Sequence, residues 1–269
     1  MPAPSITLSL ATRQNLLSLQ NTVSLIGRTQ QRLSTGQKVN DPIDNASAFF
    51  NAQSLRNRGF DFGSSKDAIG QAINTVKAGL DAMSSISDVL GQMKALAEQV
   101  LAGQGTASVL NTQFNELRAQ LDNIITDSSY QGVNLVSGSN LLKINFNETA
   151  AAEQTITGTT NTGSGLAINA ESISNASVAS DAVTALTTAL SSVRARSTAL
   201  GSTASFLQVR LDFNARYIND LTEGADRLTL ADSNEEAANL TALQTRQQVG
   251  VSALALAAQS ERAILALFQ

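Results

Sequence analysis

The sequence predicts a mainly α-helical protein, an elongated antiparallel bundle of long helices with paired N- and C-terminal coiled-coil helices and a small β-hairpin region. Three observations predict this fold class. Apolar residues recur at alternating spacings of three and four over most of the chain, the C-terminal segment is apolar on nearly every side of a helix, and one glycine-rich stretch at residues 132–176 interrupts the pattern. A length of 269 residues with 42% hydrophobic content is enough for a substantial core.

The first predicted helix begins near Ser5 and ends at Gly36, a residue type that often terminates helices. Its apolar residues form two stripes, which indicates two neighbours. The first stripe is a heptad seam and the second lies beside it; they consist of Leu16, Leu19, Val23, Ile26, Gln30 and Leu33, and of Leu10, Leu17 and Leu25. We expect this N-terminal segment, residues 1–36, to pair with residues 234–269.

The last predicted helix starts at Asp232-Ser233-Asn234-Glu235-Glu236, which holds two overlapping capping boxes. From Val249 onward the only charges are Glu261 and Arg262. The large apolar residues there point in nearly every direction around the helix and are Val249, Val251, Leu254, Leu256, Ile264, Leu265, Leu267 and Phe268. The apolar surface of such a helix must be covered on all sides.

A bilayer is a poor surround for this helix, because residues 259–262 would place polar and charged groups inside the required span of about 20 residues. Protein is the favoured surround, either within the core of a globular domain or between subunits. A two-helix pair would leave one apolar stripe of each partner uncovered. We therefore expect other subunits to complete the burial, and both chain ends to be disordered in a free monomer.

Between the terminal helices the pattern predicts a separate middle bundle. Residues 37–57 contain Asp41-Pro42, which favours a turn, and are expected to form a linker. Residues 58–136 are expected to hold two amphipathic helices and a turn, and residues 181–233 one long helix with Asn214 on its seam as a possible register residue. The core positions of the first of these helices repeat at sevens: Ile69, Val76, Met83, Leu90 and Ala97.

The interruption at residues 137–180 is expected to be a variable surface insertion containing a β-hairpin. Leu142, Ile144 and Phe146 alternate with polar residues there, as in a half-buried strand. Its serine and threonine runs carry no strong packing signal, so a solvated loop is the simplest interpretation. Hydroxyls in this loop are candidates for O-linked sugars, namely Thr155, Thr157, Thr159, Thr160, Thr162 and Ser164.

Composition argues against several functions. Without Cys or His, the chain cannot build a thiolate zinc site, a cysteine nucleophile or a Ser-His-Asp triad, and neither enzymatic activity nor a cofactor or metal is expected. A formal charge of -4 gives no support to nucleic-acid binding, and the C-terminal helix has too few basic residues for a membrane-active helix. The first residues lack a basic n-region, so if this protein leaves the cell, it is expected to do so without a cleaved signal peptide.

Several stretches resemble bacterial flagellin. They are Leu33-Ser34-Thr35-Gly36-Gln37-Lys38-Val39-Asn40, Tyr130-Gln131-Gly132-Val133-Asn134-Leu135, Asn239-Leu240-Thr241-Ala242-Leu243-Gln244-Thr245-Arg246-Gln247-Gln248 and Ser260-Glu261-Arg262-Ala263-Ile264-Leu265-Ala266-Leu267-Phe268. The resemblance covers roughly residues 1–140 and 180–269. It departs at Pro42, Asn45 and Phe49-Phe50, where the family often has an Ala-rich segment with paired acids, and the outer insertion is shorter than in large flagellins.

The resemblance implies a secreted structural subunit that polymerises into the extracellular flagellar filament and supports swimming motility. The terminal helices would form the inner tube and the middle helices an outer tube. It also implies type III export, an export chaperone on the C-terminal segment, a distal cap and hook-junction proteins as partners. A hook–filament junction protein of the same family is the alternative.

Two sets of functional positions follow. The residues expected to make inter-subunit contacts are Leu16, Leu19, Val23, Ile26, Leu33, Val251, Leu254, Ile264, Leu265, Leu267 and Phe268. The family's epitope for Toll-like receptor 5 aligns with Gln92, Leu96 and Glu116, and its key arginine falls on Gln92. A glutamine amide offers fewer donors than a guanidinium and no charge, so weak detection by this receptor is expected.

Overall fold

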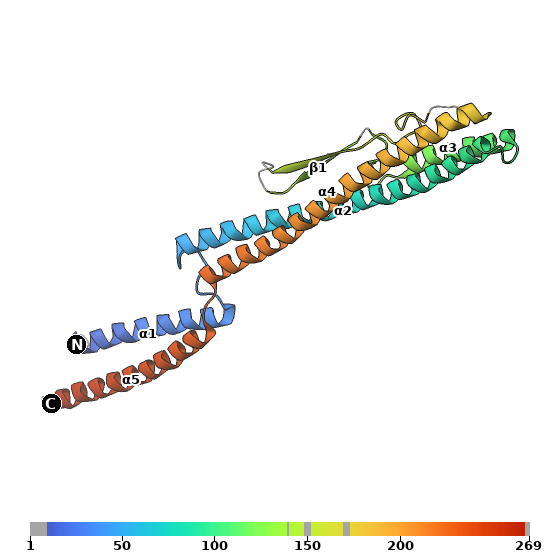
Figure 1. The fold of residues 1–269 in the computed structure, drawn as a ribbon. Coiled ribbons are helices and arrows are strands. Elements are labelled where there is room, and N and C mark those ends of the chain that lie inside the picture. The colour runs from blue at the N-terminus through green and yellow to red at the C-terminus, as the bar shows by residue number, and fades with distance from the viewer. Residues whose placement is uncertain (1–9, 139, 148–151, 169–172, 267–269) are drawn as a thin grey trace. The chain divides into compact units, whose positions relative to one another are not determined.

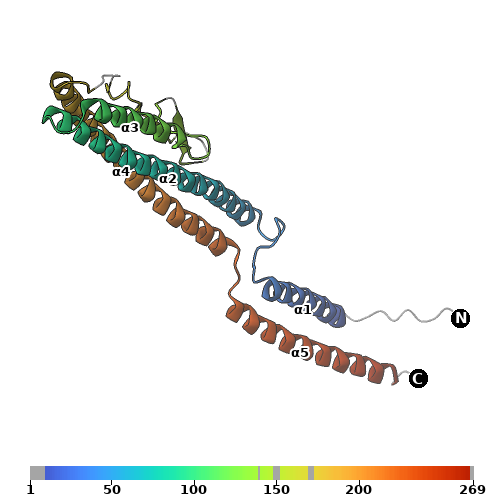
Figure 2. The ribbon, with the colours of Figure 1, turned by 90° about the vertical axis from the view of Figure 1, so that its right-hand side faces the viewer.

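The protein is described by a computed structural model that covers residues 10–138, 140–147, 152–168 and 173–266. Its elements are, in chain order, α1 (Leu10–Thr35), α2 (Ala46–Leu101), α3 (Ala107–Asp127), β1 (Leu141–Asn145), β2 (Glu153–Thr157), α4 (Ala176–Thr229) and α5 (Ser233–Ala266). Figures 1 and 2 show this order along the colour bar. The predicted fold class, mainly helical with long helices, paired terminal helices and one small hairpin, is confirmed.

The chain divides into two compact units. One combines the described residues up to Arg56 with those from Thr222 onward, and the other contains residues 57–221. Helices α2 and α4, of 56 and 54 residues, contribute to both units.

The second unit is a bundle of α2, α3 and α4, which lie side by side in both ribbon views (Figures 1 and 2). The heptad positions predicted on α2 form its core, and all of them are at most 1% exposed: Ile69, Val76, Met83, Leu90 and Ala97. Phe114 and Leu121 of α3 join them, together with Leu186 and Leu207 of α4. This confirms that the middle helices are amphipathic and share one core.

The predicted hairpin is present. Strands β1 and β2 pair antiparallel, with Leu141 opposite Thr157 and Asn145 opposite Glu153. Ile144 and Ile156 point into the shared core, whereas their neighbours along each strand are more exposed. The alternation read from the sequence therefore selects the correct buried face.

The segment after the hairpin differs from the expected solvated loop. Leu166, Ile168 and Ile173 are buried in the core of the second unit, and Asn161 is fully buried. The Asn161 amide donates to the Val136 carbonyl at 3.0 Å and the Thr159 carbonyl at 2.7 Å. The composition of this segment does not predict that it packs into the core, because its apolar residues are few. The buried Asn161 amide is satisfied by hydrogen bonds to backbone carbonyls.

The predicted linker is shorter than residues 37–57, because α2 begins at Ala46. The Asn45 side chain accepts a hydrogen bond from the Ala48 amide at 3.0 Å, as an N-cap residue does. Residues 46–57 are therefore helical and not part of the linker. Asn45 is a residue type that favours helix starts, so the sequence contains a signal for this boundary. α2 ends at Leu101, and Gly103 and Gly105, which follow it, both have positive φ angles.

Candidate assembly surface on the terminal helices

Helices α1 and α5 pack against each other along a heptad seam. On α1 the residues turned toward α5 alternate between threonines that are buried and aliphatic residues that are half-buried. They are Thr12, Leu19, Thr22, Ile26, Thr29 and Leu33, spaced by seven, three, four, three and four. Small threonine side chains at a seam allow the two helices to approach closely.

The matching seam of α5 starts at Glu236, which is buried, and continues at alternating spacings of four and three through half-buried residues. These are Leu240, Leu243, Gln247, Gly250, Leu254 and Ala257. A Cβ added at Gly250 would lie 3.2 Å from Leu19 Cδ1, so the two helices approach closely at this glycine. The seam of α5 therefore has room for Leu19 of α1 at this position.

Large apolar residues remain exposed beside this seam. On α1 they are Leu10, Leu16, Leu17, Val23 and Leu25, and on α5 they are Val249, Val251 and Leu256, the last 70% exposed. Of the seam predicted on α1, Leu19, Ile26 and Leu33 face α5, whereas Leu16 and Val23 do not. On α5, Leu254 is half-buried and Val251 exposed.

The remaining predicted assembly residues lie at the end of α5 or beyond it. Ile264 and Leu265 belong to the helix, but their side chains lie outside the described part of the chain. Leu267 and Phe268 lie outside the described residues altogether.

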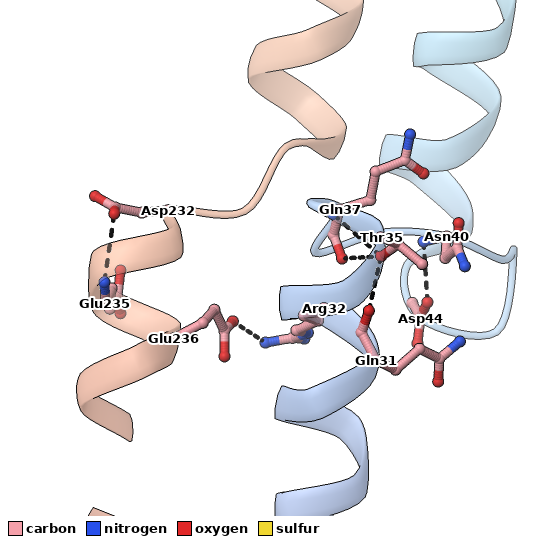
Figure 3. Close-up of polar contacts among 9 residues, drawn as sticks. All are labelled: Gln31, Arg32, Thr35, Gln37, Asn40, Asp44, Asp232, Glu235 and Glu236. Carbon is pink, nitrogen blue, oxygen red and sulfur yellow. Dashed lines mark hydrogen bonds and ion pairs between the residues drawn. The ribbon is translucent and has the colours of Figure 1, made fainter. Parts of the chain in front are cut away.

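One ion pair fixes the seam at its end nearest the connectors. The Arg32 guanidinium donates to the Glu236 carboxylate with an Nη1–Oε1 distance of 2.9 Å (Figure 3). Glu236 is buried, so loss of Arg32 would leave a buried carboxylate unpaired, which costs more than breaking a solvent-exposed pair. The sequence pattern predicts a capping box between Ser233 and Glu236. In the structure, the Glu236 carboxylate instead pairs with Arg32 of α1.

The cap of α5 comes from Asp232 instead. Its Oδ1 accepts the Asn234 amide at 2.9 Å and the Glu235 amide at 3.3 Å, so the predicted helix start is confirmed (Figure 3 draws the contact with Glu235).

The two connectors beside the ion pair are joined by backbone hydrogen bonds. The Lys38 amide donates to the Thr229 carbonyl at 2.7 Å, and the Ala231 amide donates to the Gly36 carbonyl at 2.9 Å. Gly36 has a φ of 70°, which an L residue adopts at a cost and which ends α1 sharply. The Arg56 guanidinium also donates to the Thr229 hydroxyl at 2.9 Å.

The first connector contains a tight turn from Asp41 to Asp44, closed by the Asp44 amide donating to the Asp41 carbonyl at 3.1 Å. The Asp44 carboxylate accepts the amides of Asn40 at 3.1 Å and Asp41 at 3.3 Å (Figure 3 draws the contact with Asn40). These bonds hold the pKa of Asp44 below its ordinary value of 3.8, and the charges of Arg32 and Arg28 lower this pKa further.

The other predicted positions lie in the second unit. Asn214 is fully buried on α4, where its amide donates to the Phe146 carbonyl at 3.4 Å. Gln92 is exposed on α2, Leu96 is half-buried and Glu116 is exposed on α3. Of the hydroxyls considered for sugars, Thr159 and Thr162 are half-buried and the others are exposed.

Within the described part of the chain, no helix is long and apolar enough to cross a membrane. Beside their shared seam, α1 and α5 expose stripes of large apolar residues. An arrangement of this kind suits association with other protein chains.

Comparison with known proteins agrees with this arrangement. Residues 6–141 match the bacterial flagellin N-terminal helical region, and residues 182–268 match the bacterial flagellin C-terminal helical region. Flagellin FljO of Caulobacter vibrioides is 31% identical over 264 residues, which cover 94% of this chain and 96% of that protein. A flagellin of Brucella melitensis is 27% identical over 94% of this chain and 95% of its own length.

Solved structures support the fold. The Bacillus cereus flagellin crystal structure aligns with a TM-score of 0.50 at 19% identity, over 55% of this chain and 88% of that one. A putative flagellar hook-associated protein from Vibrio parahaemolyticus aligns with a TM-score of 0.56 at 14% identity, over 70% of this chain and all of that one. With both family regions matched and a relative above 30% identity over nearly its whole length, the chain belongs to the bacterial flagellin family.

Proposed function

We infer that this protein is the structural subunit that polymerises into the helical flagellar filament used for swimming. The observation that carries this conclusion is the set of exposed aliphatic residues beside the α1–α5 seam, since a subunit that remained alone would leave them in water. Membership of the flagellin family supports the same function. No observation favours the hook–filament junction protein over the filament subunit.

We propose that the inter-subunit contacts involve Leu16, Val23 and Val251, which the α1–α5 pair leaves exposed. Leu19, Ile26, Leu33 and Leu254 would contribute indirectly, because they hold the pair together. We also assign Ile264, Leu265, Leu267 and Phe268 to these contacts, on the ground of their apolar character alone. In this proposal, residues 1–36 and 234–269 form the inner tube, and the second unit forms the outer tube.

The wider partners also remain proposals. Flagellins that leave the cell through a type III apparatus need a chaperone on the C-terminal segment and a distal cap, and the resemblance implies both for this chain. The protein would then act outside the cell. The exposed hydroxyls of the insertion, such as Thr155 and Ser164, are candidates for O-linked sugars, and an intact mass of native filaments equal to that of the bare chain would rule this out.

The decisive experiment is polymerisation of the purified chain, followed by negative-stain microscopy and by the critical concentration. We expect a higher critical concentration after deletion of residues 264–269 and after the substitution Val251→Ser, about tenfold higher for the substitution. These apolar side chains are buried only when subunits assemble, so their loss weakens assembly. Val109→Ser removes an equally exposed valine from α3 and is the matched control. Wild-type critical concentrations for the deletion and for Val251→Ser would contradict the proposal.

A further inference from the structure

A groove between α1 and α5 carries an excess of positive charge. Its volume is about 360 Å³, and Leu25 and Leu243 contribute apolar walls. Three arginines, Arg28, Arg32 and Arg246, line it against the single carboxylate of Glu236, which leaves a formal excess of two positive charges (three minus one). Glu236 already pairs with Arg32 (Figure 3).

The other two arginines are available to a partner. Arg28 and Arg246 are both exposed, and neither forms an ion pair with any residue that the structure describes. A ligand for this groove therefore needs a carboxylate beside an apolar group. We call the groove, defined by Arg28, Arg246, Leu25 and Leu243, the arginine groove.

The same chain presents such a ligand on the connector before α2. Ile43 is 97% exposed, the highest value among the large hydrophobic residues that the structure describes. It occupies the tip of the Asp41–Asp44 turn next to Pro42, whose ring fixes φ. The Asp41 carboxylate lies on this turn, exposed and in no side-chain hydrogen bond or ion pair with the described residues. We call Asp41, Pro42 and Ile43 the knob.

Hydrogen bonds hold the turn that carries the knob. The Asp44 carboxylate accepts two backbone amides of the turn, and the turn is closed by a further backbone hydrogen bond. An apolar group held in this way loses little conformational entropy when it is buried, which favours binding. The exposure of Ile43 also shows that its own chain does not cover it.

We propose that the knob of one subunit docks into the arginine groove of a second subunit, with Ile43 between Leu25 and Leu243 and Asp41 beside Arg246. Charge complementarity supports a second copy as the occupant, because the groove is basic and the knob acidic. The knob and the groove are different surfaces of one chain, so the contact is heterologous, and contacts of this kind build an open helical polymer where the rotation between subunits does not close a ring. The proposal rests on the filament function proposed above and adds a specific contact to it.

The absence of cysteine makes a direct test possible. Chains carrying Ile43→Cys are mixed with chains carrying Ala242→Cys, which places a thiol on the groove wall, and are copolymerised and mildly oxidised. We expect disulfide-linked dimers of the two variants in filaments and none in unpolymerised protein. Ser252→Cys is the matched control, because it is exposed on the same helix but does not line the groove.

Filaments whose dimer yield is no higher with Ala242→Cys than with Ser252→Cys would overturn the proposed contact and leave the filament function intact. Failure of the wild-type chain to form filaments would instead overturn the function. Dimers formed equally in unpolymerised protein would also contradict a polymer contact.

A charge swap tests the assignment of Asp41 to Arg246. Asp41→Arg and Arg246→Asp should each raise the critical concentration about threefold or more, and the double variant should restore it. Asp67→Arg combined with Arg246→Asp makes the same change in net charge and should not restore assembly. Unchanged melting would show that the second unit of each variant folds, and restored assembly of the double variant would show that the substitutions leave the first unit competent to assemble. A double variant no better than the single ones would overturn the assignment.

Discussion

At the scale of single residues, Asn214 combines full burial with an incompletely paired amide. Its Nδ2 donates to the Phe146 carbonyl, while its Oδ1 has no partner among the residues that the structure describes. An unpaired buried acceptor costs about 1–3 kcal/mol. We therefore expect Asn214→Leu to keep or raise the melting temperature of the second unit while the β1–β2 amides exchange faster, because the hairpin loses its tether.

The aspartate variant should behave oppositely. Asn214→Asp places an uncompensated carboxylate beside the Phe146 carbonyl and should lower stability by several kcal/mol. Thermal unfolding and hydrogen exchange distinguish the two variants. A clear drop in melting temperature for Asn214→Leu would mean that the bond to Phe146 outweighs the cost of the unpaired oxygen.

Gln92 gives a second prediction at this scale. It is exposed on α2, one turn before the half-buried Leu96, where the family resemblance places a receptor-binding arginine. Losing such an anchor costs about 2 kcal/mol or more, roughly 30-fold in affinity. A Toll-like receptor 5 reporter assay on monomer should give weak signalling for the wild-type chain and stronger signalling for Gln92→Arg, but not for the exposed control Gln113→Arg. Strong signalling by the wild-type chain would refute the prediction that Gln92 weakens receptor binding.

At the scale of elements, Gly250 controls the spacing of α1 and α5. Gly250→Ala should be nearly neutral, because about 1 kcal/mol of helix propensity is offset by the small shift required of Leu19 at 3.2 Å. Gly250→Leu should separate the helices and raise the critical concentration about tenfold or more. Gly91→Leu, on the open surface of α2, is the control, and a filament assembly unaffected by Gly250→Leu would refute the role of this close contact.

The elements also show what sequence can predict. The core of the second unit was predictable because large apolar residues occupy four of the five heptad positions predicted on α2, with Ala97 as the exception. The seam of α1 was only half predictable, because threonines fill its buried positions and leave leucines such as Leu16 outside. Hydrophobicity alone cannot distinguish a face that meets the partner helix from one that awaits another chain. The burial of Leu166, Ile168 and Ile173 depends on tertiary contacts that no local pattern reveals.

At the scale of the whole molecule, the two units differ in how much apolar surface they bury by themselves. The second unit has a dense core, whereas the fully buried residues of α1 are Thr12, Thr22 and Thr29. We expect trypsin to cut monomers early at Arg13, Arg28, Arg32, Arg246 and Arg262, leaving a fragment near residues 58–230. Arg32 should be cut later than Arg28 because of its ion pair with Glu236.

Filaments provide the comparison for this experiment. Assembly buries the exposed stripes, so all five sites should become resistant, and the fragment should be identified by mass. Monomer and filament digested at the same rate would show that the terminal pair is already stable alone. The second unit should stay resistant in both states.

The backbone hydrogen bonds between the two connectors bear on the mechanics of a rotating propeller. Backbone hydrogen bonds join Lys38 to Thr229 and Gly36 to Ala231. Tension on one connector is therefore partly transferred to the other connector. Two coupled strands resist twisting better than two independent ones, which can rotate past each other. Torque transmitted through a subunit would therefore be distributed over both connectors. Lys38→Pro, which removes the amide donor of this residue, would make the paired connectors more flexible without altering either helix.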